Sequence, residues 1–188
     1  MILESTIKQA ARILKDHNIC SYKLDAEIIL SHIMGVNREF LLSNDYINIP
    51  ECKIKKFNYA ISRRIKNEPV AYITGTKEFW SQNFKVNRYT LVPRPETELL
   101  IYKVVKFFKN KKINILDIGT GSGCILLSIL KELNFSRGIG IDVSAKAVQI
   151  AKLNSKKLNL FQRAKFKVSD IGKFNLGKYD LIVSNPPY

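Results

Sequence analysis

The sequence has few cysteines and histidines and no long hydrophobic run. Its three cysteines are odd in number and form no Cys-x-x-Cys pair, so neither a disulfide framework nor a metal site is indicated. No apolar run approaches the roughly 20 residues that span a bilayer, and the N-terminus lacks the basic-then-apolar pattern of a secretion signal. We therefore expect a cytoplasmic protein without a membrane segment, whose cysteines are small buried residues.

Acidic residues are also scarce. The 188-residue chain has 16 Asp and Glu against 31 Lys and Arg, a formal net charge of +15, which favours anionic partners through long-range attraction. The lysines are nevertheless spread along the whole chain, and the densest basic run, 53–66, carries apolar residues at helical spacing. A solvated helix face accounts for this run, so we expect no direct binding of nucleic acid.

The hydrophobic pattern changes twice along the chain. Residues 1–74 repeat apolar side chains at helical spacing and predict a small helical domain. It carries no catalytic cluster, so we expect it to serve as a scaffold or to dock a partner. Residues 75–95 contain two short β-type runs on either side of 81–83, followed by the segment 93–95, whose two prolines enforce an extended turn. This pattern predicts a hairpin connector. Residues 96–188 alternate strand and helix patterns, which predicts an α/β domain with a parallel sheet covered by helices.

Within the α/β domain, strands are expected at 113–118, 138–143, 164–169 and 179–184, and helices at 123–133 and 145–157. A further helix is expected to begin at 96–98 and to bury a stripe of Leu99, Leu100, Val104, Phe107 and Phe108. This order brings the carboxyl ends of the strands to one edge of the sheet, where parallel sheets bind ligands.

A glycine-rich turn follows the first of these strands. It consists of Gly119, Thr120, Gly121, Ser122 and Gly123. Glycine permits a tight bend, and free N–H groups favour an anionic ligand group. A dinucleotide fingerprint would need glycine at Cys124 and has no use for an acid at Asp117. Asp117 suits S-adenosyl-methionine, whose methionine part carries an ammonium as well as a carboxylate; a turn without any ligand stays the alternative.

Two more acids end the next two expected strands. Asp142 can accept hydrogen bonds from both ribose hydroxyls of a nucleoside, and Asp170 can accept one from an adenine amine. The pair Ser169-Asp170 could equally cap a loop. We favour the ligand role because Asp117, Asp142 and Asp170 all fall at the carboxyl ends of expected parallel strands.

The fourth strand is followed by Asn185, Pro186, Pro187 and Tyr188. An amide or aromatic amine nitrogen is a poor nucleophile because its lone pair is conjugated. Hydrogen bonds from its N–H groups to the Asn185 side-chain oxygen and the Pro186 carbonyl would orient it, while Tyr188 packs on the planar group. The prolines remove competing donors and lock the backbone. A proline-terminated strand without a catalytic role is the alternative.

These motifs together resemble the peptide chain release factor glutamine methyltransferases, the PrmC/HemK family. The resemblance also rests on Tyr72-Ile-Thr-Gly75, Glu78-Phe-Trp80 and Pro93-Arg-Pro-Glu-Thr-Glu98. It implies a Rossmann-like, S-adenosyl-methionine-dependent methyltransferase that modifies the glutamine of the Gly-Gly-Gln loop of release factors, and we expect it to act as a monomer. Family members continue past this point through further strands, so the sheet is expected to be incomplete at its C-terminal side, in a fragment or a truncated gene product.

Carried over by motif, the resemblance implies that the cofactor is held at 119–123, Asp142 and Asn185, and the substrate glutamine at 185–188. The residue after the third-strand acid is often an aromatic that packs on adenine in relatives. Here it is Ile171, which offers apolar contact but no stacking.

Two other functions are compatible with the sequence. An adenine amino-methyltransferase acting on DNA or RNA uses the same chemistry on an exocyclic amine, but it needs a base-flipping or target-reading region that is not evident here. A cofactor-binding or partner-docking remnant without turnover is the third possibility.

Overall fold

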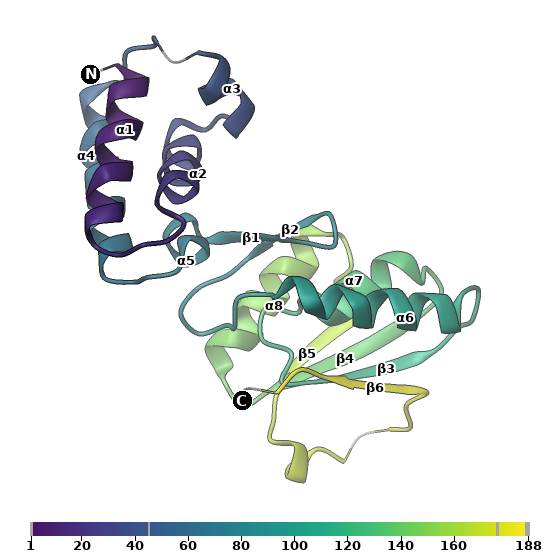
Figure 1. Ribbon diagram of the computed structural model, residues 1–188. Helices are drawn as coiled ribbons and strands as arrows, with labels where there is room; N and C mark the ends of the chain where they lie inside the picture. The colour runs from purple at the N-terminus through teal and green to yellow at the C-terminus, as the bar shows by residue number, and fades with distance from the viewer. Residues whose placement is uncertain (1, 45, 176, 187–188) are drawn as a thin grey trace. The chain divides into compact units, whose positions relative to one another are not determined.

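The computed structural model describes residues 2–44, 46–175 and 177–186. The chain divides into two compact units, Met1–Thr74 and Gly75–Tyr188, each with its own apolar core (Figure 1). Among the described residues, no helix combines the length and the apolar character needed to cross a membrane.

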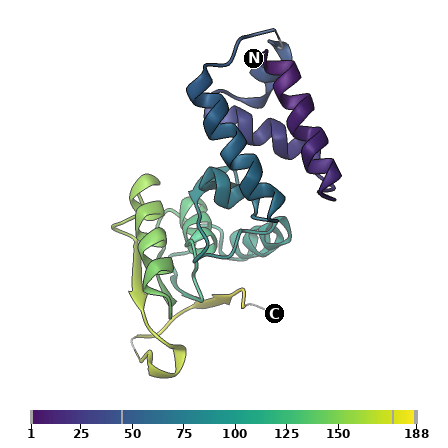
Figure 2. The ribbon, with the colours of Figure 1, turned by 90° about the vertical axis from the view of Figure 1, so that its left-hand side faces the viewer.

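The first unit is helical. Its helices are α1 (Leu3–Asp16), α2 (Tyr22–Met34), α3 (Arg38–Ser43), α4 (Glu51–Ile65) and α5 (Val70–Thr74). The amphipathic pattern explains α1, which buries Leu3, Ala10 and Leu14. Helix α2 ends at Gly35, whose φ of +75° is the left-handed conformation that closes many helices. Helices α1, α2 and α4 pack on one another (Figures 1 and 2). Phe57 of α4 is fully buried in the core of this unit.

Two acidic side chains of α2 are buried in this unit. Asp25 and Glu27 are only 5% and 2% exposed. Arg64 Nε donates to Asp25 Oδ2 at 2.7 Å, and Arg38 Nε donates to Glu27 Oε2 at 2.6 Å. A buried carboxylate is tolerated only when it is paired and hydrogen-bonded. Arg64 and Arg38 therefore supply the counter-charges that the two buried carboxylates need.

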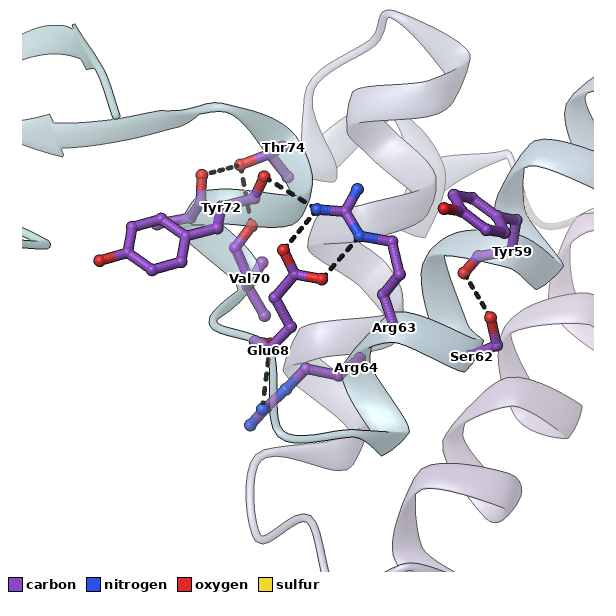
Figure 3. A network of polar contacts seen from close by, with 9 residues as sticks. Tyr59, Ser62, Arg63, Arg64, Glu68, Val70, Tyr72 and Thr74 are labelled. Carbon is purple, nitrogen blue, oxygen red and sulfur yellow. Dashed lines mark hydrogen bonds and ion pairs between the residues drawn. The ribbon is translucent and has the colours of Figure 1, made fainter. Parts of the chain in front are cut away.

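Arg63 fixes the loop that follows α4 (Figure 3). Its guanidinium donates to both carboxylate oxygens of Glu68, at 2.7 and 2.5 Å, and to the Tyr72 carbonyl at 3.4 Å. Arg64 Nη1 also donates to the Glu68 carbonyl, at 3.3 Å. Because a bidentate arginine–carboxylate pair is geometrically specific, these contacts hold the loop between α4 and α5 in one conformation.

The second unit is an α/β domain. Its strands are β1 (Thr76–Phe79), β2 (Gln82–Lys85), β3 (Asn114–Ile118), β4 (Arg137–Asp142), β5 (Ala164–Val168) and β6 (Leu181–Ser184). Its helices are α6 (Glu98–Phe108), α7 (Cys124–Glu132) and α8 (Ala145–Lys157), with single 3-10 turns at Pro95–Thr97 and Ile171–Lys173. Strands β3 to β6 form one parallel sheet in the order β5-β4-β3-β6. Helices α7 and α8 pack on its strands and α6 packs on α7 (Figures 1 and 2). The expected α/β fold after a helical region is confirmed.

The hairpin β1–β2 turns at Trp80-Ser81, whereas the sequence predicts the connection at 81–83. Both turn residues have positive φ, +50° and +52°, which is the pattern of a two-residue type I′ turn. The Trp80 backbone N–H donates to Glu98 Oε1 at 2.8 Å, and its indole N–H donates to Glu132 Oε1 at 2.8 Å. These two bonds, made by residues distant in sequence, stabilise a conformation that non-glycine residues rarely adopt.

The buried face of α6 also differs from the expected stripe. Ile101 and Val104 face the core, whereas Leu99 and Phe107 are 58% and 69% exposed. Apolar residues occupy more than one face of this helix, and its packing on α7 determines which face is buried.

The expectation that all three cysteines are buried is wrong for two of them. Cys20, in the loop after α1, and Cys52, in the first turn of α4, are exposed, because neither lies on the apolar face of a helix. Cys124 is buried, and this burial raises the pKa of its thiol to about 12. Its thiol is therefore a packing group rather than a nucleophile.

Candidate active site

The carboxyl ends of β3 to β6 surround a cavity of about 430 Å³. Because Asp117 of β3 lies opposite both Gly140 of β4 and Val183 of β6, the loops after these strands meet at the same edge of the sheet. The Ser184 hydroxyl donates to the Ile118 carbonyl at 2.9 Å and joins the ends of β6 and β3.

The lining contains seven residues that the sequence assigns to the site: Gly119, Gly121, Asp142, Asp170, Ile171, Asn185 and Pro186. The sequence analysis does not identify the others: Tyr89, Leu91, Ile118, Ile141, Val143, Ser169 and Ser184. Pro187 and Tyr188, also assigned to the site by sequence, lie outside the described residues.

Backbone hydrogen bonds hold the glycine turn. Gly119, Gly121 and Gly123 have φ of +70°, +55° and +79°, the left-handed region that glycine adopts without strain. The N–H of Thr120 donates to the Ile141 carbonyl at 2.9 Å, and that of Gly123 donates to the Thr120 carbonyl at 2.8 Å. Buried N–H groups need acceptors, and these two find them within the protein. They therefore do not contribute to the anion cradle that the sequence suggests.

Asp142 joins the glycine turn to α8. Its Oδ2 accepts from the Gly121 N–H at 2.9 Å, and its Oδ1 accepts from the Ser144 N–H at 2.8 Å. The Ser144 hydroxyl in turn caps α8 by accepting from the Ala147 N–H at 3.2 Å. Since a carboxylate oxygen can accept two hydrogen bonds, Asp142 can hold the turn and still accept from a ligand in the cavity.

Four predicted cofactor residues lie outside the lining: Asp117, Thr120, Ser122 and Gly123. Side chains alternate along a strand, so Asp117 points to the face opposite that of the cavity-lining Ile118. Asp117 is 1% exposed, and its Oδ2 accepts from the Thr120 hydroxyl at 2.6 Å, whereas its Oδ1 has no partner among the described residues. These residues support the turn from beneath rather than facing the cavity.

Burial raises the pKa of the Asp117 carboxyl from 3.8 to about 6, although the hydrogen bond from Thr120 opposes this change. Between these two pH values the folded chain retains a proton that the unfolded chain loses. Folding stability therefore falls as the pH rises from about 4 to about 6 and stays lower above this window. The difference corresponds to about 3 kcal/mol.

We expect the substitution Asp117→Asn to stabilise the free chain by up to about 3 kcal/mol at pH 8 and to change its stability little below pH 4. Asparagine keeps an acceptor for Thr120 and does not ionise. Urea unfolding at both pH values, followed by fluorescence of Trp80, the sole tryptophan, measures the effect in the second unit. A variant that is less stable than the unmodified chain at pH 8 would contradict the cost assigned to the buried charge.

Asn154 also shapes the site, although it belongs to no sequence motif. This residue of α8 is fully buried, and its Oδ1 accepts from the Lys85 N–H at 2.7 Å. Its Nδ2 donates to the carbonyls of Lys85 and Ser122, at 3.0 and 2.8 Å. It therefore connects the hairpin to the glycine turn. The available sequence signal is an amide at helical spacing from the apolar Ala147 and Ala151.

Asp170 takes the capping role that the sequence leaves open. Its Oδ1 accepts from the Gly172 N–H at 2.7 Å and caps the 3-10 turn that begins at Ile171. It also lines the cavity together with Ile171, which is 50% exposed. The hydrogen bond of this cap fixes the position of Ile171 in the lining of the cavity.

Two family models match the chain, one described as PrmC N-terminal domain over residues 5–75 and one described as methyltransferase domain over residues 109–187. A release factor glutamine methyltransferase from Buchnera aphidicola subsp. Baizongia pistaciae is 37% identical over 189 residues, which cover 100% of this chain and 68% of that protein. The chain belongs to the release factor glutamine methyltransferase family. The resemblance seen in the sequence motifs is thus confirmed.

A further family member, from Buchnera aphidicola subsp. Acyrthosiphon pisum, is 41% identical over 166 residues, which cover 88% of this chain and 60% of that protein. The chain thus spans about 60% of the length of the first curated relatives that it matches. Among solved structures, the tRNA (uracil-54, C5)-methyltransferase of Pyrococcus abyssi gives a TM-score of 0.49 at 19% identity, over 60% of this chain and 28% of that one. A likeness of that size adds nothing to the family assignment.

Proposed function

We propose that this family member transfers a methyl group from S-adenosyl-methionine to the side-chain amide of a glutamine in peptide chain release factors. The observation that carries the proposal is one cavity lined by the glycine turn after β3 and by Asn185 and Pro186 after β6. The turn belongs to the cofactor side of such a reaction and the asparagine-proline pair to the acceptor side. The proposal is supported by the pairing of β3 with β6, because the loops after two paired strands lie next to each other.

The residues around the cavity fit the cofactor. Asp142 offers carboxylate lone pairs to ribose hydroxyls, and Gly119 leaves open space where a side chain would start. Asp117 lies beneath the turn and does not line the cavity. One oxygen of its buried carboxyl has no hydrogen-bond partner among the described residues, and an ammonium group that reached it would hold it in its charged form. When bound, the cofactor supplies an electrophilic methyl carbon on a sulfonium, which becomes a neutral thioether on transfer.

Asn185 and Pro186 would orient the acceptor nitrogen. The Asn185 side-chain oxygen and the Pro186 carbonyl can accept the two N–H groups of a primary amide, which fixes its plane and turns its lone pair towards the cofactor. Pro186 has no N–H of its own to compete for these acceptors. We assign Pro187 and Tyr188 to the same glutamine site on the motif alone. The helical unit would dock the release factor. The protein would act in the cytoplasm and as a monomer.

The test is methyl transfer from labelled cofactor. The protein is incubated with release factor, with release factor whose Gly-Gly-Gln glutamine is replaced by Ala, and with DNA and RNA. We expect label in the first acceptor only. Label confined to nucleic acid would replace the proposal with an adenine amino-methyltransferase. If calorimetry shows binding of S-adenosyl-homocysteine but no acceptor is methylated, the protein would be a cofactor-binding remnant without turnover.

A further inference from the structure

Tyr89 stands in the wall of the cofactor cavity, in a segment for which the sequence shows no function. The sequence leaves the cavity without an aromatic at Ile171, yet Tyr89 lines the same cavity as Ile171 and Asp142. We propose that Tyr89 is the aromatic wall of the purine subsite, against which the adenine of the cofactor packs. This inference rests on the proposed function, because it requires an adenosyl ligand.

A rigid turn presents this ring. The Tyr89 N–H donates to Asn87 Oδ1 at 3.0 Å, and the Thr90 N–H donates to the Asn87 carbonyl at 2.9 Å. The Thr90 hydroxyl is 3.0 Å from the same carbonyl and accepts from the Asn87 N–H at 3.1 Å. Thr90 itself is 3% exposed and anchors the turn in the protein. Residues on a turn with so many internal bonds lose little entropy when a ligand binds.

The phenol is tethered as well. Lys146 Nζ and an Arg88 guanidinium nitrogen each donate to the Tyr89 oxygen at 2.9 Å. The two cations also lie 4.1 and 5.0 Å from the ring centroid, within the range of cation–π attraction. They bind the hydroxyl and lie over part of the ring, while 37% of the residue stays exposed.

The hydrogen bond from Lys146 to the phenol oxygen places the ring on the side of the cavity where Asp142 would bind the ribose. Lys146 lies in the first turn of α8, and the Ser144 that caps this helix donates its N–H to Asp142. A nucleoside whose ribose hydroxyls bind Asp142 therefore has its base within reach of this wall. Val143, 71% exposed, and Ile171 add apolar lining around it. A planar, weakly polar base fits a wall of this composition, and aromatic packing against a base does not depend on which base it is.

The experiment is a calorimetric titration of the 188-residue chain with S-adenosyl-homocysteine and with adenosine. We expect the substitution Tyr89→Ala to weaken both ligands roughly 5- to 10-fold, because both carry the purine. Tyr89→Phe keeps the ring and loses the tether, so its loss should be smaller, about 2- to 3-fold. Tyr102→Ala is the matched control: it removes a half-exposed tyrosine of α6 outside the cavity and should leave both affinities unchanged.

Each other outcome is decisive. Unchanged affinities in Tyr89→Ala would overturn the role of Tyr89 and leave the proposed function standing. Weakening of S-adenosyl-homocysteine alone would place Tyr89 at the amino-acid end of the ligand and also overturn it. Absence of S-adenosyl-homocysteine binding by the unmodified chain would overturn the proposed function and this inference together.

Discussion

Replacing Asn185 with Ala should lower the turnover number for methyl transfer to a release factor by roughly 10²- to 10³-fold, the usual effect of removing one preorganised group at the reacting centre. Asn185 lines the same cavity as Gly119 and Gly121, and in the proposed reaction its side-chain oxygen orients the amide nitrogen. Alanine leaves the Pro186 carbonyl as the remaining acceptor, so the nitrogen loses its fixed orientation. Steady-state kinetics with saturating release factor and cofactor measure the effect.

Asn175 offers a matched control. It is an exposed asparagine in the loop before β6 and lies outside the cavity lining. The substitution Asn175→Ala removes the same amide and should leave turnover unchanged. The affinity for S-adenosyl-homocysteine should fall by less than tenfold in Asn185→Ala, since the glycine turn and Asp142 remain. Full turnover by the Asn185 variant would refute the role assigned to its side chain.

Replacing Arg64 with Met should destabilise the helical unit by about 3 to 5 kcal/mol. The side chains of Asp25 and Arg64 are only 7% and 16% exposed, and their charged atoms are 2.7 Å apart. Methionine fills much of the space but leaves the Asp25 carboxylate without a counter-charge, with Ser21 as a neutral donor at 2.8 Å. We place the loss at the low end of the range because of this remaining bond. Urea unfolding followed by far-ultraviolet circular dichroism measures it.

Lys55→Met is the matched control on the same helix. Lys55 pairs with Glu51 at 3.0 Å, but the two side chains are 76% and 81% exposed. Such surface pairs contribute about 1 kcal/mol or less, so this variant should unfold close to the unmodified chain. Trp80 belongs to the second unit, and its fluorescence reports on that unit separately. Equal stabilities of the two variants would show that the buried pair contributes no more than an exposed one.

The elements that the sequence predicts well are those whose signal is local and repeated. Helix α8 occupies the expected residues 145–157, and the four strands of the sheet lie within two residues of their expected starts. A period of 3.6 or of 2 in apolar residues, bounded by glycine or a capping serine, is sufficient for this. The turn of the hairpin lies at Trp80-Ser81 instead of at 81–83, because Trp80 carries no turn signal and its positive φ is supported by Glu98 and Glu132.

The candidate site, like the fold, is predicted by the sequence only in part. The sequence predicts the glycines, acids and asparagine at strand ends as site residues, because binding of a nucleoside or an amide depends on particular residue types at short spacing. It does not distinguish residues that face the cavity from those that support it. Asp117 and Gly119 are neighbours in one motif, yet only Gly119 lines the cavity, while Asp117 is buried beneath the turn.

Residue types in order along the chain thus determined the family, the helical region followed by an α/β fold, and the strand ends that carry the polar groups. Tertiary structure decided which arginines neutralise the buried Asp25 and Glu27, and that Asn154 connects the hairpin to the glycine turn. It also decided that Tyr89, 82 positions before Ile171, shares a cavity with it. The reason is physical: periodicity and capping are properties of neighbouring residues, whereas charge pairing, burial and cavity walls depend on groups that only chain folding brings together.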